Sequence, residues 1–239
     1  MEAIVISFSF VFGLVFGSFY NVVIYRVPRN LSIVKPGSSC PACGHQLAPI
    51  ELVPVASYLV QRGRCRSCGA HIHWRYPVIE LMTGLSFALV AWTSPSWQDF
   101  VTGLIFFSLL FILGIIDLEH KLLPNVLTLP GVGFGLLFSL CGWTLPFSWS
   151  VLGAVVGFGL LFAIALISRG GMGMGDVKLM ALIGSFLGWK AVFYVLFGAA
   201  LFGSVGGLLY LYSTKQGKKT PIPFGPSLAL AAFLYFLVV

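Results

Sequence analysis

Two aspartates stand out among the seven carboxylates of this 239-residue chain, because each lies at the end of a long hydrophobic stretch. Asp117 lies in FILGIIDLEHKLLPN, and Asp176 lies in GGMGMGDVKLM. A charged side chain at the centre of a membrane helix costs about 2.5–3.5 kcal/mol on insertion scales, so such aspartates are candidates for function. If they share one site, the pair is expected to hold a single proton near neutral pH.

Such a pair suits the hydrolysis of a peptide bond. The ionised carboxylate can take a proton from an attacking water, while the protonated one polarises the carbonyl and later protonates the leaving amine. The sequence contains no His–Glu metal motif or intramembrane Ser–His pair that would compete for this role. Each aspartate also has a simpler interpretation, Asp176 as a helix N-cap and Asp117 as a side chain solvated among lipid headgroups.

The surroundings of Asp176 are rich in glycine. The run comprises Gly170, Gly171, Gly173 and Gly175. Glycines permit positive φ and the close approach of another backbone, including that of an extended substrate. Lys178 could stabilise an ionised aspartate or anchor its helix at the membrane interface. Glycines in membrane helices also form packing surfaces, which is the role expected for residues 153–157 (GAVVG).

Composition predicts the fold class. The chain is 58% hydrophobic and 9% charged, with a mean hydropathy of +0.98, whereas soluble domains carry roughly 25% charged residues. We therefore predict an all-α polytopic membrane protein with about eight transmembrane helices, six or seven being the alternatives. The expected spans are 3–25, 78–93, 99–117, 125–143, 149–168, 177–189, 191–212 and 224–239. The first is expected to be a membrane anchor, because it lacks the basic start and the cleavage site of a signal peptide.

The basic residues predict the orientation. With eight spans, all 14 lysines and arginines except Lys190 fall in loops on one side of the membrane. Cytoplasmic loops carry such an excess, so this side is expected to face the cytoplasm. Asp117 and Asp176 then lie at the same cytoplasmic face, separated by a hairpin of two spans. The net charge of +7 is explained by this topology, and we expect no nucleic-acid partner because there is no separate basic domain.

The polar segment 26–77, between the first two spans, is predicted to be a small cytoplasmic zinc-binding module. Its four candidate ligands are Cys40, Cys43, Cys65 and Cys68, arranged as two C-x2-C pairs separated by 21 residues. This spacing is typical of a four-thiolate site for structural Zn²⁺, in which no position is left for substrate. The expected domains are thus a first transmembrane helix at 1–25, the zinc-binding module at 26–77 and a transmembrane core at 78–239.

Other interpretations of the cysteines remain open. The two pairs could be redox or disulfide pairs, although disulfides do not persist on the reducing side of the membrane. One of His45, His71 or His73 could replace a cysteine as a ligand. Cys141, in the fourth predicted span, is expected to be a small packing residue.

Several sequence motifs closely resemble, in content and in order, those of the type 4 prepilin peptidases. The members of this family are bifunctional leader peptidase/N-methyltransferases of the GxGD aspartyl class. The similarity covers nearly the whole chain. The matching segments are GSFYNVVIYRVPR (17–29), the two cysteine pairs with RGRCRSC (62–68), WRYPVIELMTG (74–84), DLEHKLLPNVLTLP (117–130), GMGMGDVKLMALIGSFLGW (171–189) and PFGPSLALAA (223–232).

The resemblance implies that Asp117 and Asp176 are the catalytic pair of a bacterial inner-membrane endopeptidase. Its substrates would be type IV prepilins or secretion-system pseudopilins, whose basic leader is removed after a glycine while their apolar helix lies among the membrane lipids. It also implies N-methylation of the new N-terminal residue with S-adenosyl-L-methionine. The candidates for substrate binding or methylation are Glu80, Lys178, Gly173 and Gly175. Glu80 could hold the new ammonium group or could simply pair with Arg75.

The chain departs from the family pattern at a few positions. Asn125 stands where the family often has Asp, His73 stands where Ser is expected, and Glu51 lies at a position that is neutral or acidic in the family. Two other functions are alternatives to the peptidase. A proton-coupled transporter would use the same carboxylates, but it predicts internal repeats, and the sequence contains no clear one. A zinc-bearing scaffold would predict that both aspartates are dispensable.

Overall fold

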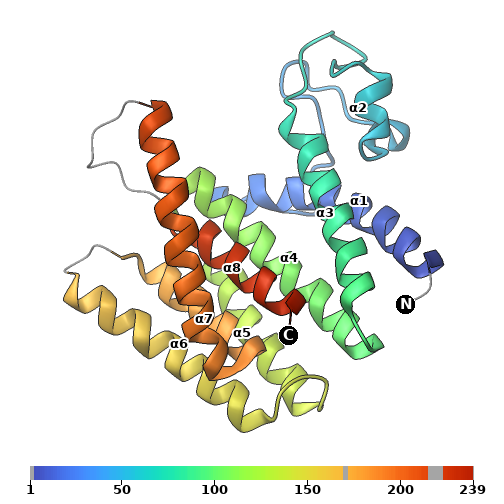
Figure 1. The fold of residues 1–239 in the computed structure, drawn as a ribbon. Helices are drawn as coiled ribbons and strands as arrows, with labels where there is room; N and C mark the ends of the chain where they lie inside the picture. Colours follow the sequence, from blue (N-terminus) through green and yellow to red (C-terminus); the bar gives the residue numbers. More distant parts are fainter. Residues whose placement is uncertain (1–2, 169–171, 215–222, 239) are drawn as a thin grey trace. The chain divides into compact units, whose positions relative to one another are not determined.

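The computed structural model describes residues 3–168, 172–214 and 223–238 (Figure 1). Within these ranges the regular secondary structure is helical, apart from two isolated β-bridges in the cysteine-rich segment. The prediction of an all-α fold is therefore confirmed. Six residues of the sequence argument lie outside the described ranges: Arg169, Gly170, Gly171, Lys215, Lys218 and Lys219. The chain divides into two compact units, Met1–Pro95 and Ser96–Val239.

The first unit is built on two long helices, α1 (Ala3–Arg26) and α3 (Arg75–Thr93), which pack against each other. Gly17 allows the closest approach, since a Cβ added there would lie 2.6 Å from the Cα of Glu80. Small residues let membrane helices approach in this way. The contact places one turn of α1 directly beside Glu80.

Between α1 and α3 the chain forms short elements and two tight turns. The helical elements are η1 (Val27–Arg29), η2 (Pro49–Leu52) and α2 (Ala56–Val60). A segment of this size has little apolar core of its own, so its fold depends on additional constraints such as a bound metal. The turns that carry the cysteines supply the groups for such a constraint.

The second unit consists of five apolar helices. They are α4 (Trp97–His120), α5 (Asn125–Leu140), α6 (Phe147–Ile167), α7 (Met174–Thr214) and α8 (Gly225–Val238). α7 is central, because it packs against α5, α6 and α8, while α8 also packs against α4. Leu110, Leu182, Ile183 and Leu228 are fully buried in the shared core.

The long α7 is broken at Gly188, which has φ +79 and ψ 172. The first part ends against the connection between α5 and α6, where Gly188 meets Leu145. The second part returns toward the start of α8, where Gly203 meets Phe224. The break falls at the boundary between the predicted spans 177–189 and 191–212, so α7 corresponds to two spans. A positive φ at this turn favours glycine.

Five helices are long and apolar enough to cross a membrane. Their ranges are Ala3–Arg29, Arg75–Thr93, Trp97–His120, Phe147–Ile167 and Met174–Gly207. The apolar helices α5 and α8 are shorter, with 16 and 14 residues. Counting α7 as two, the described residues form eight apolar helices. Many large apolar side chains point outward, such as Phe8, Val155 and Phe197, which suits a multi-pass protein surrounded by lipid.

Candidate functional site

Asp117 lies in the last turn of α4 and is buried, with 6% of its surface exposed. Its Oδ2 accepts a hydrogen bond of 3.0 Å from the backbone N–H of Gly225, at the start of α8. The helix ends just beyond it because Lys121 adopts a left-handed conformation and donates its backbone N–H to the carbonyl of Asp117 at 2.9 Å. The side chain is thus held inside the helix bundle, and the interpretation of a headgroup-solvated aspartate does not fit.

Asp176 lies in the first turn of α7 and is half-buried. Its backbone N–H donates to the carbonyl of Gly173 at 3.1 Å, and the backbone of Gly173 also hydrogen-bonds the carboxylate. A Cβ added to Gly173 would meet Asp176 Oδ2 at 3.7 Å, an ordinary van der Waals contact, so space beside the carboxylate does not require this glycine. Asp176 is not the N-cap but the third residue of α7, and its carboxylate accepts the N–H of the preceding Gly173 as in a capping box. This contact does not exclude a second role.

Asp117 and Asp176 lie close enough for their charges to influence each other. Two like charges in a low-dielectric setting repel strongly, so both carboxylates do not ionise cheaply in one site. One carboxylate retaining a proton relieves this repulsion. A pair in this state contains an acid and a base side by side, as general acid–base catalysis requires.

Contacts from neighbouring helices fix the start of α7. Gly175 packs so closely on Leu123 that a Cβ added to the glycine would lie 2.9 Å from that of the leucine. Lys178 Nζ donates to Asn125 Oδ1 at 2.8 Å, which ties α7 to α5. Within the described part of the chain, Lys178 therefore bonds to an amide and not to either aspartate. Gly175 and Lys178 position the helix that carries Asp176.

Sequence reasoning missed Gly225 and Asn125 as residues of this site. Gly225 contacts Asp117 so closely that an added Cβ would lie 2.6 Å from Oδ2. Its signal in the sequence is PFGP at residues 223–226, a glycine between two prolines at a helix start. In the sequence Asn125 is only a departure from the family pattern, because its partner Lys178 lies 53 residues further along the chain.

The four cysteines converge in the first unit. Their Sγ atoms all lie within 4.8 Å of one another, and those of Cys40 and Cys68 are 3.9 Å apart. All four thiols are free, so the alternative of disulfide pairs is not observed. Residues 39–46 and 64–71 form equivalent turns in which the first cysteine accepts an N–H from a glycine with positive φ, Gly44 or Gly69. This repeated geometry is that of zinc knuckles.

The electrostatics of the cluster fit a bound cation. The backbone N–H groups of Cys43 and Ala42 lower the pKa of the Cys40 thiol to about 7. The N–H of His45 acts on Cys43 in the same direction, but the neighbouring thiols, Cys68 foremost, outweigh it and raise the pKa of Cys43 to about 11. Several thiolates this close together are stable only beside a positive ion. The four sulfur atoms, within 4.8 Å of one another, could hold a metal ion, and four thiolates are a donor set that Zn²⁺ prefers.

Two of the three candidate histidines have other partners. His45 Nε2 lies 3.1 Å from Glu51 Oε2, which also accepts the backbone N–H of Ala48 at 2.9 Å. His73 Nδ1 accepts the backbone N–H of Arg75 at 3.1 Å. Among the described residues the candidate metal cluster contains cysteines alone. The variant with a histidine ligand is therefore not supported.

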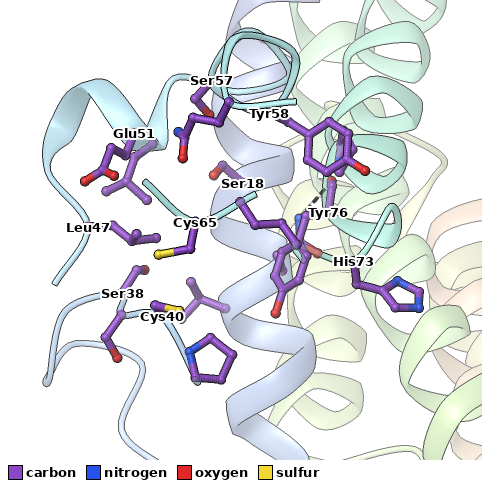
Figure 2. A pocket seen from close by; sticks show the side chains of 18 of the residues that line it. Ser18, Ser38, Cys40, Leu47, Glu51, Ser57, Tyr58, Cys65, His73 and Tyr76 are labelled. Atoms are coloured by element: carbon purple, nitrogen blue, oxygen red, sulfur yellow. Dashed lines mark hydrogen bonds between the residues drawn. The ribbon is translucent and has the colours of Figure 1, made fainter. Parts of the chain in front are cut away.

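Glu80 lies in α3 and belongs to the first compact unit, whereas both aspartates belong to the second. It is buried, its Oε2 accepts the backbone N–H of Val55 at 2.7 Å, and it also hydrogen-bonds the side chain of Ser18. Its carboxylate thus connects the cysteine-rich segment to α1 and α3. Glu80 also lines a cavity of about 540 Å³ that is bounded by the same segments (Figure 2).

Comparisons with known proteins cover both units. Residues 11–94 match the family described as bacterial peptidase A24 N-terminal domain, and residues 104–208 match the type IV leader peptidase family. The chain is 38% identical to the prepilin leader peptidase/N-methyltransferase of Bacillus subtilis, over 97% of this chain and 94% of the relative. It is 37% identical to the protein of the same name from Aeromonas salmonicida, over 97% of this chain and 90% of the relative.

A third relative, the prepilin leader peptidase/N-methyltransferase of Myxococcus xanthus, is 42% identical over 89% of this chain and 65% of the relative. No solved structure matches the chain. Full-length similarity at this level, together with two family matches that follow each other along the chain, confirms the resemblance drawn from the motifs. The chain belongs to the type IV leader peptidase family.

Proposed function

We propose that this chain is a membrane aspartic endopeptidase that removes the leader from type IV prepilins or pseudopilins and then N-methylates the new N-terminal residue. Membership of a family whose relatives are named prepilin leader peptidase/N-methyltransferase supports both activities. The observation that supports the peptidase is that Asp117 and Asp176 lie within range of each other's charge. Their carboxylates come from the ends of two different helices, where an extended peptide backbone can approach glycine-rich turns.

In the proposed reaction one proton is shared between Asp117 and Asp176. The ionised carboxylate takes a proton from water as the water attacks the scissile carbonyl, and the protonated carboxylate donates to the carbonyl oxygen. Collapse of the tetrahedral intermediate transfers a proton to the leaving amine. The backbone N–H of Gly225 orients Asp117 during this cycle, because it binds Oδ2 at 3.0 Å. The pair acts as one unit, so loss of either member is expected to stop cleavage.

The proposed location is the bacterial inner membrane, with the aspartates at the cytoplasmic face. All but one of the 14 basic residues fall on that side of an eight-span arrangement, which is the distribution expected for cytoplasmic loops. A prepilin would lie with its apolar helix among the lipids and its basic leader in the cytoplasm. The cut would then occur where the two segments meet, at the membrane surface.

Two cofactors are proposed. Zn²⁺ would be held by the four cysteines and would stabilise the fold of the module, since a four-thiolate site has no open position for chemistry. S-Adenosyl-L-methionine would supply the methyl group for the second activity. The functional division that we propose is a first transmembrane helix at 1–25, the zinc-binding module at 26–77 and the core with the aspartate pair at 78–239.

The test of the peptidase is to replace each aspartate by its isosteric amide. Purified Asp117→Asn and Asp176→Asn should each lose leader removal from a prepilin in detergent, measured by mass spectrometry. Asp99→Asn is the matched control, because Asp99 lies at the opposite end of α4, where it interacts with Ser96. It should cleave at the normal rate. Retained cleavage by either amide variant would remove that aspartate from the mechanism.

A further inference from the structure

The stretch that follows α1 exposes apolar side chains between two basic residues. Leu31 and Val34 are 52% and 77% exposed, and in the sequence they lie between Arg29 and Lys35. The backbone N–H of Leu31 donates to the carbonyl of Arg26 at 3.0 Å, so the stretch is tied to the last turn of α1. Since α1 is long and apolar enough to cross a membrane, these exposed side chains lie where that span ends.

The short helix α2 repeats this pattern. Its last two residues, Leu59 and Val60, are 67% and 83% exposed, and the exposed Arg62 and Arg64 follow them. Apolar patches that are bordered by polar residues mark sites of contact with other proteins or with membranes. The cysteine-rich segment therefore has two such patches, each accompanied by basic side chains.

A hydrogen bond holds α2 at the level of the membrane surface. The backbone N–H of Val55, which precedes α2, donates to Glu80 Oε2 at 2.7 Å. Glu80 lies five residues after the start of α3 at Arg75, and a helix rises 1.5 Å per residue, so this contact lies about 7 Å inside the apolar span. The headgroup layer on each side of a bilayer is about 5–7 Å thick, which places α2 among the headgroups. Figure 1 shows α2 beside the first turns of α3.

The charge of the segment selects the kind of lipid. Residues 26–77 contain seven lysines and arginines and one carboxylate, a net charge of +6 with neutral histidines. A zinc ion held by four thiolates would change this value to +4. The carboxylate, Glu51, is buried, and Lys35, Arg62 and Arg64 form no ion pair with any residue that the structure describes. A surface of this kind attracts anions.

We infer that both stretches of the cysteine-rich segment dock on the anionic phospholipid headgroups of the bilayer that α1 and α3 cross. Their exposed apolar side chains enter the interface, while Lys35, Arg62 and Arg64 contact lipid phosphates. Arginine is well suited to this contact because its guanidinium donates two parallel hydrogen bonds to a phosphate. Apolar and basic side chains together hold peripheral segments on anionic membranes. This inference concerns lipid binding and does not depend on the proposed reaction.

Two other occupants fit these patches less well. A second copy of the chain would bring the same positive charge to the contact, and like charges repel each other. A free phosphate ion would bind the arginines but would leave the apolar side chains in water. Lipid satisfies both groups, and it is already present beside the spans to which the two stretches are tied.

The experiment is hydrogen–deuterium exchange of the full chain, purified with zinc and placed one copy per nanodisc. Discs of phosphatidylcholine alone are compared with discs that also contain phosphatidylglycerol. Peptides that cover residues 31–35 and 58–64 should exchange about fivefold more slowly in the anionic discs, which is the effect expected for about one basic side chain near an anionic surface. Peptides from α6, in the other unit, should exchange equally in both kinds of disc.

Variants separate charge from apolar contact. Arg62→Gln combined with Arg64→Gln should remove the lipid dependence of residues 58–64, whereas lysine at both positions should retain it. Val60→Ser should speed exchange of α2 in both kinds of disc, because it weakens the apolar contact. Lys190→Gln removes one charge in the other unit, and this matched control should behave like the unmodified chain. An unchanged zinc content shows that each variant is folded.

The same measurement separates the occupants. Glycerol phosphate added to phosphatidylcholine discs should not slow exchange, because the docking surface requires a bilayer. Equal exchange in the two kinds of disc, or full lipid dependence in the glutamine variant, overturns the inference. Protection by soluble glycerol phosphate, or protection only in discs that hold two copies, also overturns it and assigns the surface to a free anion or to a second chain.

Discussion

The carboxylate of Asp117 is held by the backbone N–H of Gly225, a residue 108 positions further along the chain, at 3.0 Å from Oδ2. This contact joins the end of α4 to the start of α8. It orients one of the two aspartates proposed for catalysis, and it is possible only because Gly225 has no side chain. Several expected outcomes depend on such contacts between distant residues.

Gly225→Ala should abolish or strongly reduce leader removal. A Cβ at this position would lie 2.6 Å from Asp117 Oδ2, so the carboxylate must move away from its hydrogen-bond donor. A misplacement of about 1 Å at a catalytic group can cost about a hundredfold in rate. Initial rates of prepilin cleavage measure the effect. Gly114→Ala, on the same helix as Asp117, is the matched control because its Cβ would meet atoms only at 3.4 Å or beyond. Equal rates in the two variants would contradict this role of Gly225.

The contact between Asn125 and Lys178 should position Asp176. Asn125→Leu removes the acceptor of the 2.8 Å hydrogen bond, so the start of α7 becomes less fixed and the cleavage rate should fall about tenfold, with KM little changed. Asn125→Asp keeps an acceptor and adds a charge opposite the lysine, so its rate should equal or exceed that of the unmodified chain. If Asn125→Leu cleaves at the normal rate, the contact has no positioning role.

Removal of the metal should unfold the cysteine-rich module and leave the second unit intact. Metal analysis should find about one zinc ion per chain, and Cys65→Ala should contain almost none, because structural zinc binds through all four ligands. Limited proteolysis should then cut within residues 30–74, because a segment of this size has little apolar core of its own. Cys141→Ala is the control and should retain its zinc. Full zinc content in Cys65→Ala would exclude the four-thiolate site.

Gly153→Ala should lower the thermal stability of the second unit. A Cβ on Gly153 would overlap the carbonyl oxygen of Gly184, so α6 and α7 cannot keep their separation. Overpacking of this kind costs about 1–3 kcal/mol. Gly159→Ala, on the same helix, adds a Cβ with no atom within 4 Å, and its melting temperature should stay close to that of the unmodified chain. Melting can be followed by circular dichroism in detergent, and identical curves for both variants would exclude a tight α6–α7 contact.

The proposed orientation can be tested with the native cysteines. Cys141 is exposed at the end of α5, beside the turn at Gly142, and the eight-span arrangement places it on the side away from the cytoplasm. A membrane-impermeant maleimide should therefore label Cys141 in intact spheroplasts, and the label should disappear in Cys141→Ala. Labelling of Cys141 only after lysis would invert the proposed orientation.

The sequence alone determined the fold class and singled out the aspartates and the four cysteines as candidate site residues. Hydrophobic stretches and C-x2-C pairs are local patterns. They can be recognised without knowledge of the fold, because each reflects the requirements of one segment. The break in α7 also has a local cause, since Gly188 interrupts an otherwise helical stretch. The packing role expected for residues 153–157 is confirmed by the contact of Gly153 with Gly184.

Only the tertiary structure decided which distant groups meet. Three examples are the hydrogen bond from Gly225 to Asp117, the hydrogen bond from Lys178 to Asn125, and the packing of α3 against α1. All three join different helices, and hydrophobic periodicity does not specify which helices become neighbours. Each of these contacts joins residues that are distant in the sequence, so it is defined only when packing has placed both partners.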